Sequence, residues 1–225
     1  MAEHTRLRRV FFLLIASVSG ILAGAYLILP QAGRKLMVGE NSPSEIITSV
    51  LALSAAVIGF RTLLSRRGRA YAKVLYLLPL FSLFFFLEEI SYGGIYFHIK
   101  YPRFLGYELQ SVHDLWPACY RALVHQDAVL GYGLLLGLML AALPGVILLR
   151  RRYGKCFAAW YRENPCCYYF TVALGLIVSA QVFDLDLFRR QAIRFVEASL
   201  EMNGALALLF AALALARSRS RAIPD

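Results

Sequence analysis

The sequence has little charge. Asp, Glu, Lys and Arg make up 17% of the 225 residues, whereas 59% are hydrophobic. This balance excludes an ordinary soluble domain and indicates helices that pack against one another inside a lipid bilayer. None of the hydrophobic runs alternates between polar and apolar residues, which excludes the strands of a transmembrane β-barrel.

Several other signals are missing. The four cysteines include no C-x-x-C pair and predict no structural disulfide. The net charge of +10 is not accompanied by a nucleic-acid-binding motif, so we expect no nucleic-acid partner. No internal repeat is visible, which counts against the architecture of many secondary transporters.

What is present is a series of six hydrophobic runs. Each is long enough to cross a bilayer as a helix, which takes about 20 residues. The runs cover about 10–30, 44–64, 71–95, 127–149, 166–187 and 196–216. The sequence therefore predicts an all-α, polytopic membrane protein with six transmembrane helices that form a single domain over 1–225.

The first two runs have recognisable starts. The first follows three arginines, as in a signal peptide, but its apolar core is too long for one, so we interpret it as a retained span. The second begins with Ser42 as a candidate N-cap, Pro43 at the first helical position and Glu45 at the third. These residue types at these positions are typical of a helix N-terminus.

Lysine and arginine are distributed unevenly among the loops. Sixteen of the 24 fall in 1–9, 61–73, 150–164 and 217–221, and the other eight fall in 31–43, 97–126 and 187–195. Basic residues accumulate on the cytoplasmic side of membrane proteins. The distribution therefore predicts that the N and C termini are both cytoplasmic.

The acidic residues show the opposite distribution. Eleven of the fourteen fall on the predicted outer side: Glu40, Glu45, Glu88, Glu89, Glu108, Asp114, Asp127, Asp184, Asp186, Glu197 and Glu201. Solvation in outer loops accounts for some of them. It does not account for the four within spans, where a charged side chain costs roughly 3 kcal/mol on insertion scales. These four are Glu88, Glu89, Glu197 and Glu201.

The stretch 84–94, FFFLEEISYGG, holds two of these glutamates. Glu89 lies 18 residues after the start of its run, a helical rise of about 27 Å, so the pair is expected near the outer interface. Glu197 and Glu201 share a helical face at the outer end of the sixth span. We expect two helices to present carboxylates to one cavity, with Glu89 as ligand or general base, Glu88 supporting it and Glu201 opposite.

A second charged group lies between the fifth and sixth runs. Asp184 and Asp186 end the fifth run, where carboxylates oppose the helix dipole, and Arg189, Arg190 and Arg194 follow. The group is either a structural cluster of acids and arginines or a site at which the arginines bind an anionic group such as a lipid phosphate.

The longest outer loop, 97–126, separates the third and fourth spans. It mixes aromatic and polar residues without a spanning pattern, which is typical of a segment in the membrane interface. We expect a short amphipathic helix near 108–116, broken by Pro117, that covers the acidic cavity. His113 is its best candidate metal ligand.

Two motifs carry a resemblance to a known family. The sequence EEISYG at 88–93, followed by ELQSVHDL at 108–115, resembles a signature of uncharacterised bacterial multi-span membrane proteins: EEISWGQ, then a Gln/Glu-rich element ending in Leu-His-Asn. Tyr92 occupies the aromatic position, whereas Gly94 and Asp114 depart from the usual Gln and Asn. The resemblance covers 84–116 and implies the cytoplasmic (inner) membrane of a bacterium, but no known activity.

A second comparison concerns the alkaline-ceramidase and adiponectin-receptor-like hydrolases, which are polytopic zinc proteins. Their paired histidines in a late span are missing, because no histidine follows His125. A related site would have mainly carboxylate ligands, which suit Mg²⁺, Ca²⁺, Mn²⁺ or iron better than zinc.

Three functions remain open. The first is a hydrolase or transferase that acts on a lipid-linked substrate at the outer leaflet through Glu88, Glu89 and Glu201. A divalent metal ion would be held by Glu89, His113, Glu197 and Glu201. The substrate would contact Tyr92, Asp184, Arg189 and Arg190. The second function is a proton- or cation-coupled transporter, and the third is an accessory subunit that pairs with partner membrane subunits.

Overall fold

The computed structural model describes residues 2–38, 42–64, 74–91, 101–109, 112, 115–126, 129, 133, 137, 140, 144, 151–152, 154, 161, 164–183 and 191–220. They belong to two compact units, Met1–Ile90 with Pro165–Asp225, and Ser91–Asn164. Apart from one two-stranded hairpin, the described secondary structure is helical, so the predicted all-α class is confirmed. The prediction of one domain over 1–225 stays a prediction.

The first unit is a bundle of helices. Its elements are α1 (Ala2–Ile28), α2 (Gln31–Val38), α3 (Pro43–Leu64), α4 (Val74–Glu89), α8 (Pro165–Phe183) and α9 (Gln191–Ser220). Five of them match predicted runs, whereas α2 occupies a segment that we expected to be a loop. The predicted fourth run, 127–149, lies largely outside the described residues.

Among the residues that the structure describes, four helical stretches are long and apolar enough to cross a membrane. They are Thr5–Ile28, Gln31–Leu64, which contains α2 and α3, Pro165–Phe183 and Ala192–Arg217. The described part of α4 has 16 residues, fewer than a full span requires. The chain therefore has the helices of an integral membrane protein.

The helix boundaries follow from local sequence. α3 begins as predicted: the Glu45 backbone N–H donates to Ser42 Oγ (3.4 Å), and Pro43 is the first helical residue. α1 ends at Ile28 because Pro30 disfavours the helical conformation of the residue before it. Arg34 Nε then donates to the Leu29 carbonyl oxygen (2.8 Å) and satisfies one of the acceptors left at the helix end.

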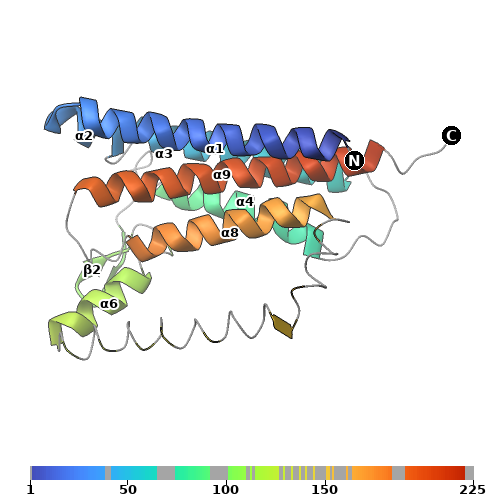
Figure 1. The fold of residues 1–225 in the computed structure, drawn as a ribbon. Coiled ribbons are helices and arrows are strands. Elements are labelled where there is room, and N and C mark those ends of the chain that lie inside the picture. Colours follow the sequence, from blue (N-terminus) through green and yellow to red (C-terminus); the bar gives the residue numbers. More distant parts are fainter. Residues whose placement is uncertain are drawn as a thin grey trace. The chain divides into compact units, whose positions relative to one another are not determined.

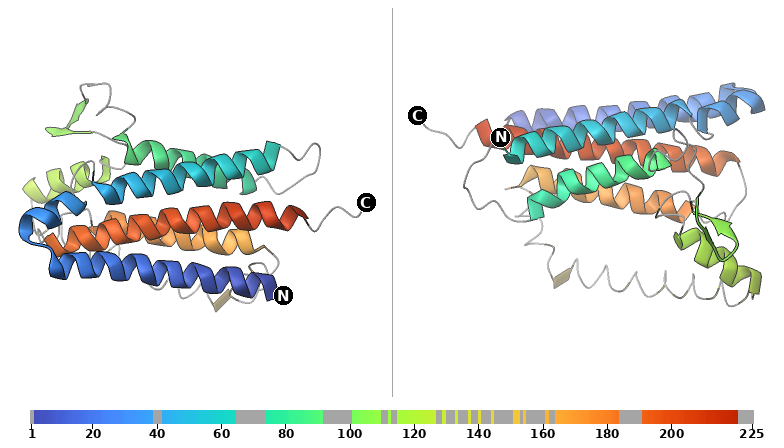
Figure 2. Two further views of the ribbon diagram at one scale, coloured as in Figure 1. Left: turned by 90° about the horizontal axis from the view of Figure 1, so that it is seen from above. Right: turned by 180° about the vertical axis from the view of Figure 1, so that it is seen from behind.

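α9 is the central helix of this unit. It contacts α1, α2, α3, α4 and α8, and Figure 2 shows it between α1 and α3 in the view from above. In the most hydrophobic stretch of α9, 67% is buried inside the protein, whereas in the corresponding stretch of α1 only 11% is buried. Helices in lipid associate through close packing of small side chains, and α9 provides them. The fully buried ones are Ala205, Ala207, Ala211 and Ala212.

Two glycines mark the closest approaches between helices. A Cβ added at Gly204 of α9 would lie 2.6 Å from Ile177 Cγ1 of α8. A Cβ added at Gly59 of α3 would lie 2.9 Å from Pro79 Cβ of α4. In both places the absence of a side chain lets the neighbouring helix approach, so the glycines fix the spacing of α8 with α9 and of α3 with α4.

The long helices of this unit run in two opposite directions. Figures 1 and 2 show the starts of α1, α4 and α8 at the same end of the bundle as the C-terminal ends of α3 and α9. The C-terminal ends of α1, α4 and α8 lie at the opposite end, with the starts of α3 and α9. α1, α3 and α4 alternate in direction, as do α8 and α9. The number of spans and the side of the membrane on which each end lies stay predictions.

The second unit contains a hairpin and a helix. Strands β1 (Arg103–Phe104) and β2 (Tyr107–Glu108) pair antiparallel, with Arg103 opposite Glu108, and those two side chains form an ion pair of 2.9 Å. The two turn residues, Leu105 and Gly106, have φ values of 51° and 85°, and two positive φ values are typical of a tight hairpin turn.

The amphipathic helix predicted near 108–116 is therefore wrong. Glu108 ends a strand, and the helix, α6, runs instead from Leu115 to Gln126. Pro117 does not break it, because proline is tolerated in the first turn, where backbone N–H groups have no partner within the helix.

Gly204→Ala is expected to destabilise the bundle, because the added methyl group would clash with Ile177. Overpacking of a buried site typically costs about 1–3 kcal/mol. Gly175→Ala on α8 is the matched control, since no described atom lies within 4 Å of its added Cβ. We would compare melting temperatures in detergent. Equal values for the two variants would contradict the close approach, and adding Ile177→Ala to Gly204→Ala should recover part of the loss.

Candidate functional site

Five glutamates of the bundle gather at one end. Glu45 lies in the first turn of α3, Glu88 and Glu89 are the last two residues of α4, and Glu197 and Glu201 lie in the first three turns of α9. The end of α4 and the starts of α3 and α9 lie together (Figure 1). We call this end of the bundle, defined by these five glutamates, the acidic end.

Glu88 is the most buried of these side chains, with 6% of its surface exposed. It stands at the carboxyl end of α4, where the helix dipole disfavours a negative charge. The helix stops directly after it: the Ile90 N–H still donates to the Phe86 carbonyl oxygen (3.2 Å), but Ser91 has a φ of 47°. A buried position at this end of a helix is costly for a carboxylate.

α4 ends soon after Glu88. In a helix that continued, Ser91 and Tyr92 would lie one turn beyond Glu88 on the same face. The left-handed conformation of Ser91 ends that face, and Tyr92 lies outside the described residues. Gly93 and Gly94 do not set the helix end, because it falls before them.

The carboxylates of α4 and α9 lie at the same level along the bundle. Pro79 of α4 rests against Gly59 of α3, and the two helices run in opposite directions. Glu88 is nine residues after Pro79 on α4, and position 50 is nine residues before Gly59 on α3. Glu88 and position 50 therefore both lie about 13 Å nearer the acidic end than the contact between Pro79 and Gly59.

The neighbouring residue of α3 connects this level to α9. Leu51 packs against a cluster that contains Phe195 and Met202 of α9. Those two residues flank Glu197 and Glu201 in the sequence. The acids of α4 therefore lie at about the level of those of α9.

The two glutamates of α9 face the α8 side of the bundle. Glu197, Glu201 and Gly204 are spaced i, i+4 and i+7, so they share one face, and Gly204 packs against Ile177 of α8. Both carboxylate side chains are half-buried. Phe195, in contrast, points to the other side and stacks edge-on against Tyr26 of α1, with 5.2 Å between ring centroids.

The structure describes four of the nine predicted site residues. Glu88, Glu89, Glu197 and Glu201 all take part in hydrogen-bonding or electrostatic interactions, so none is a free carboxylate. The other five lie outside the described residues: Tyr92, His113, Asp184, Arg189 and Arg190. Within the described part of the chain, no three His, Cys, Asp or Glu side chains form a group that could hold a metal ion.

Sequence reasoning missed a polar contact beside these acids. Asn203 of α9 is buried, and its Nδ2 donates to Ser19 Oγ of α1 (2.9 Å) and to Ser199 Oγ (3.4 Å). Its Oδ1 is buried without a hydrogen-bond partner. An asparagine inside a hydrophobic run is the signal that could have identified it, because polar side chains in spans commonly join helices.

The link between Asn203 and Ser19 should be measurable as a coupling energy. In a double-mutant cycle with Asn203→Ala and Ser19→Ala, we expect about 0.6 kcal/mol, the average for hydrogen bonds between membrane helices. Ser17 is the matched control, because its hydroxyl donates to the Leu13 carbonyl oxygen of its own helix (2.8 Å). The readout is unfolding free energy in mixed micelles, and a coupling for Ser19 no larger than that for Ser17 would contradict the contact.

Comparison of the chain with protein-family models, with curated proteins and with solved structures finds no match.

Proposed function

We propose that this chain is a six-span protein of the bacterial cytoplasmic membrane, and that its acidic end is a site at the outer leaflet. The site would act on a lipid-linked substrate as a hydrolase or transferase. The observation that carries the proposal is the burial of Glu88 at the end of α4, level with Glu197 and Glu201 of α9. An ionisable group kept at such a cost within a membrane span is a mark of a functional site.

Two carboxylates in different environments can divide acid–base work. One carboxyl can donate a proton while another accepts one. Glu88 is buried, whereas Glu89 and Glu201 are half-buried, so their environments differ. We assign the general base to Glu89, with Glu201 opposite it. Arg189, Arg190, Asp184 and Tyr92 remain the proposed contacts of the substrate head group.

A divalent metal ion fits this site only with a ligand from outside the described residues. The described glutamates do not by themselves form a group that could hold one. His113 is the proposed additional ligand, and with carboxylates it would suit Mg²⁺, Ca²⁺ or Mn²⁺. The acid–base roles assigned above do not require the metal, so metal content is a separate measurement.

One observation favours a second candidate function. Every one of the four glutamates already has an interaction partner. Acids that only pair across helices would make this chain an accessory subunit, held to partner membrane subunits through its lipid-facing helices. The two functions differ in what neutralisation of a glutamate does, which the second experiment below uses.

The orientation of the bundle can be tested with reporter fusions. Arg6, Arg8 and Arg9 of α1 and Arg61 of α3 belong to the end opposite the acids, which supports a cytoplasmic location for that end. Fusions after Gly68, after Tyr107 and at the C-terminus should therefore report inside, outside and inside. An external C-terminus would reverse the side on which the acidic end lies and remove the outer-leaflet site.

Neutralising the acids distinguishes enzyme from accessory subunit. If the site is catalytic, Glu89→Gln and Glu201→Gln should abolish turnover and leave the melting temperature unchanged or higher, because an amide is cheaper than a carboxylate in a span. If the glutamates only pair, each variant strands a buried partner at a cost of about 3–5 kcal/mol, a drop on the order of 10 °C.

The measurements are melting temperature, metal content, and mass spectrometry of a lipid extract incubated with proteoliposomes. Glu108→Gln is the matched control, because Glu108 is exposed and its pair with Arg103 contributes about 0–1 kcal/mol. If the variants have a sharply lowered melting temperature while the lipid composition of the extract and the metal content of the protein are unchanged, the proposed enzymatic function is contradicted and the role as an accessory subunit is favoured.

A further inference from the structure

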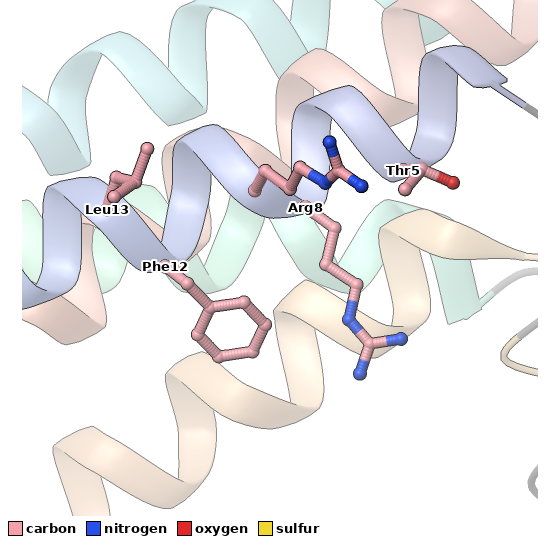
Figure 3. Close-up of a pocket in the computed structure, with 5 residues that line it drawn as sticks. Thr5, Arg8, Phe12 and Leu13 are labelled. Carbon is pink, nitrogen blue, oxygen red and sulfur yellow. The ribbon is translucent and has the colours of Figure 1, made fainter.

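A groove runs along α1 at the end of the bundle opposite the acids. It is open to the surroundings, has a volume of about 540 Å³ and is lined by Thr5, Arg8, Arg9, Phe12 and Leu13. These residues are spaced i, i+3, i+4, i+7 and i+8, so they form one stripe along the helix. Figure 3 shows Thr5, Arg8, Phe12 and Leu13 following one another along α1. The stripe is cationic near the helix start and apolar one turn further on.

The two arginines of the stripe are available to an anion. Both are exposed, and neither forms an ion pair with any carboxylate that the structure describes. The Arg8 guanidinium carbon lies 5.0 Å from the ring centroid of Tyr168 of α8 and 5.7 Å from that of Phe12. Rings that hold a guanidinium by its face leave its N–H groups, which lie in the plane, free to bind a phosphate.

The apolar part of the stripe faces away from the bundle. Phe12 is 48% exposed and Leu13 is 67% exposed, on a helix that buries little of its surface. The span in α1 begins at Thr5, so Arg8 and Arg9 lie at the level of lipid head groups. Phe12 and Leu13 lie about 6 Å deeper, where acyl chains begin.

We propose that this groove binds an anionic phospholipid of the leaflet that surrounds the N-terminus. Its phosphate lies on Arg8 and Arg9, and one acyl chain runs along Phe12 and Leu13. A free phosphate would use only the arginines and leave the apolar half of the groove unexplained, whereas a phospholipid matches both halves. Basic pockets beside membrane helices recognise anionic head groups through the same charge complementarity.

The alternative is that the arginines act only as general positive charge that orients the helix. That role is shared by Arg61, which lies at the same end of the bundle in the last turn of α3 and is exposed. Arg61 is outside the groove. It therefore provides a matched control in which the same charge is removed from the same end.

The experiment measures lipid binding by the purified full-length chain in detergent. Phosphatidylglycerol, phosphatidylcholine and inorganic phosphate are titrated separately, and melting temperature and native mass spectra are recorded. We expect phosphatidylglycerol to bind and to raise the melting temperature more than phosphatidylcholine does. Arg9→Gln should weaken its binding about fivefold, the equivalent of about 1 kcal/mol per basic residue near a membrane surface, and Arg61→Gln should leave it unchanged.

Three outcomes would overturn the proposal. They are equal binding of the two lipids, equal losses for Arg9→Gln and Arg61→Gln, and stabilisation by inorganic phosphate as large as that by phosphatidylglycerol. Arg9 packs against no described aromatic ring, so its removal should leave the fold intact. Leu13→Ala gives a second test: it should weaken binding of long-chain phosphatidylglycerol and not of the dihexanoyl form, and equal effects on both would contradict the acyl-chain contact.

Discussion

The close packing of α9 against its neighbours is the constraint on which the rest of the bundle depends. Lipid provides no hydrophobic force between helices, so their association relies on small residues that let backbones approach. Gly204 meets Ile177, and a row of buried alanines follows along α9. Because α9 contacts every other long helix of the bundle, its rotation fixes which residues face α1 and which face α8. Glu201 and Asn203 lie two residues apart and on different sides for this reason.

The helix directions then account for much of the charge distribution. The amino ends of α3 and α9 lie at the acidic end, and their dipoles favour negative charge there. Glu45 lies in the first turn of α3 and gains from this arrangement, whereas Glu197 lies beyond the first turn of α9. Glu88 and Glu89 stand at the carboxyl end of α4, where the dipole opposes them. The α4 pair is therefore the stronger argument for chemistry at this end.

The sequence predicted the presence of the helices more accurately than the residues at which they begin and end. Ser42, Pro43 and Glu45 identified the start of α3, because capping is local chemistry. Hydrophobicity, in contrast, marks only the part of a helix that lies in lipid, so α9 begins five residues earlier than its run, at Gln191, and α2 was missed. The hairpin was missed because Leu105 takes a positive φ that is uncommon for residues other than glycine. Contacts between helices, such as that of Gly204 with Ile177, could not be predicted. A small residue indicates that another helix lies close to it, but not which one.

α1 shows how few contacts hold a helix in this bundle. It buries the least of the candidate spans. Besides the contact of Tyr26 with Phe195, it is attached to α8 and α9 at two places. Near the start, Phe11 is fully buried, with ring centroids 4.9 Å from Tyr169 and 5.2 Å from Phe210. Halfway along, Ser19 accepts a hydrogen bond from Asn203. Since such a bond contributes well under 2 kcal/mol in a membrane, the aromatic cluster has to carry most of the attachment, and a lipid bound beside Phe12 would add to it from the other side.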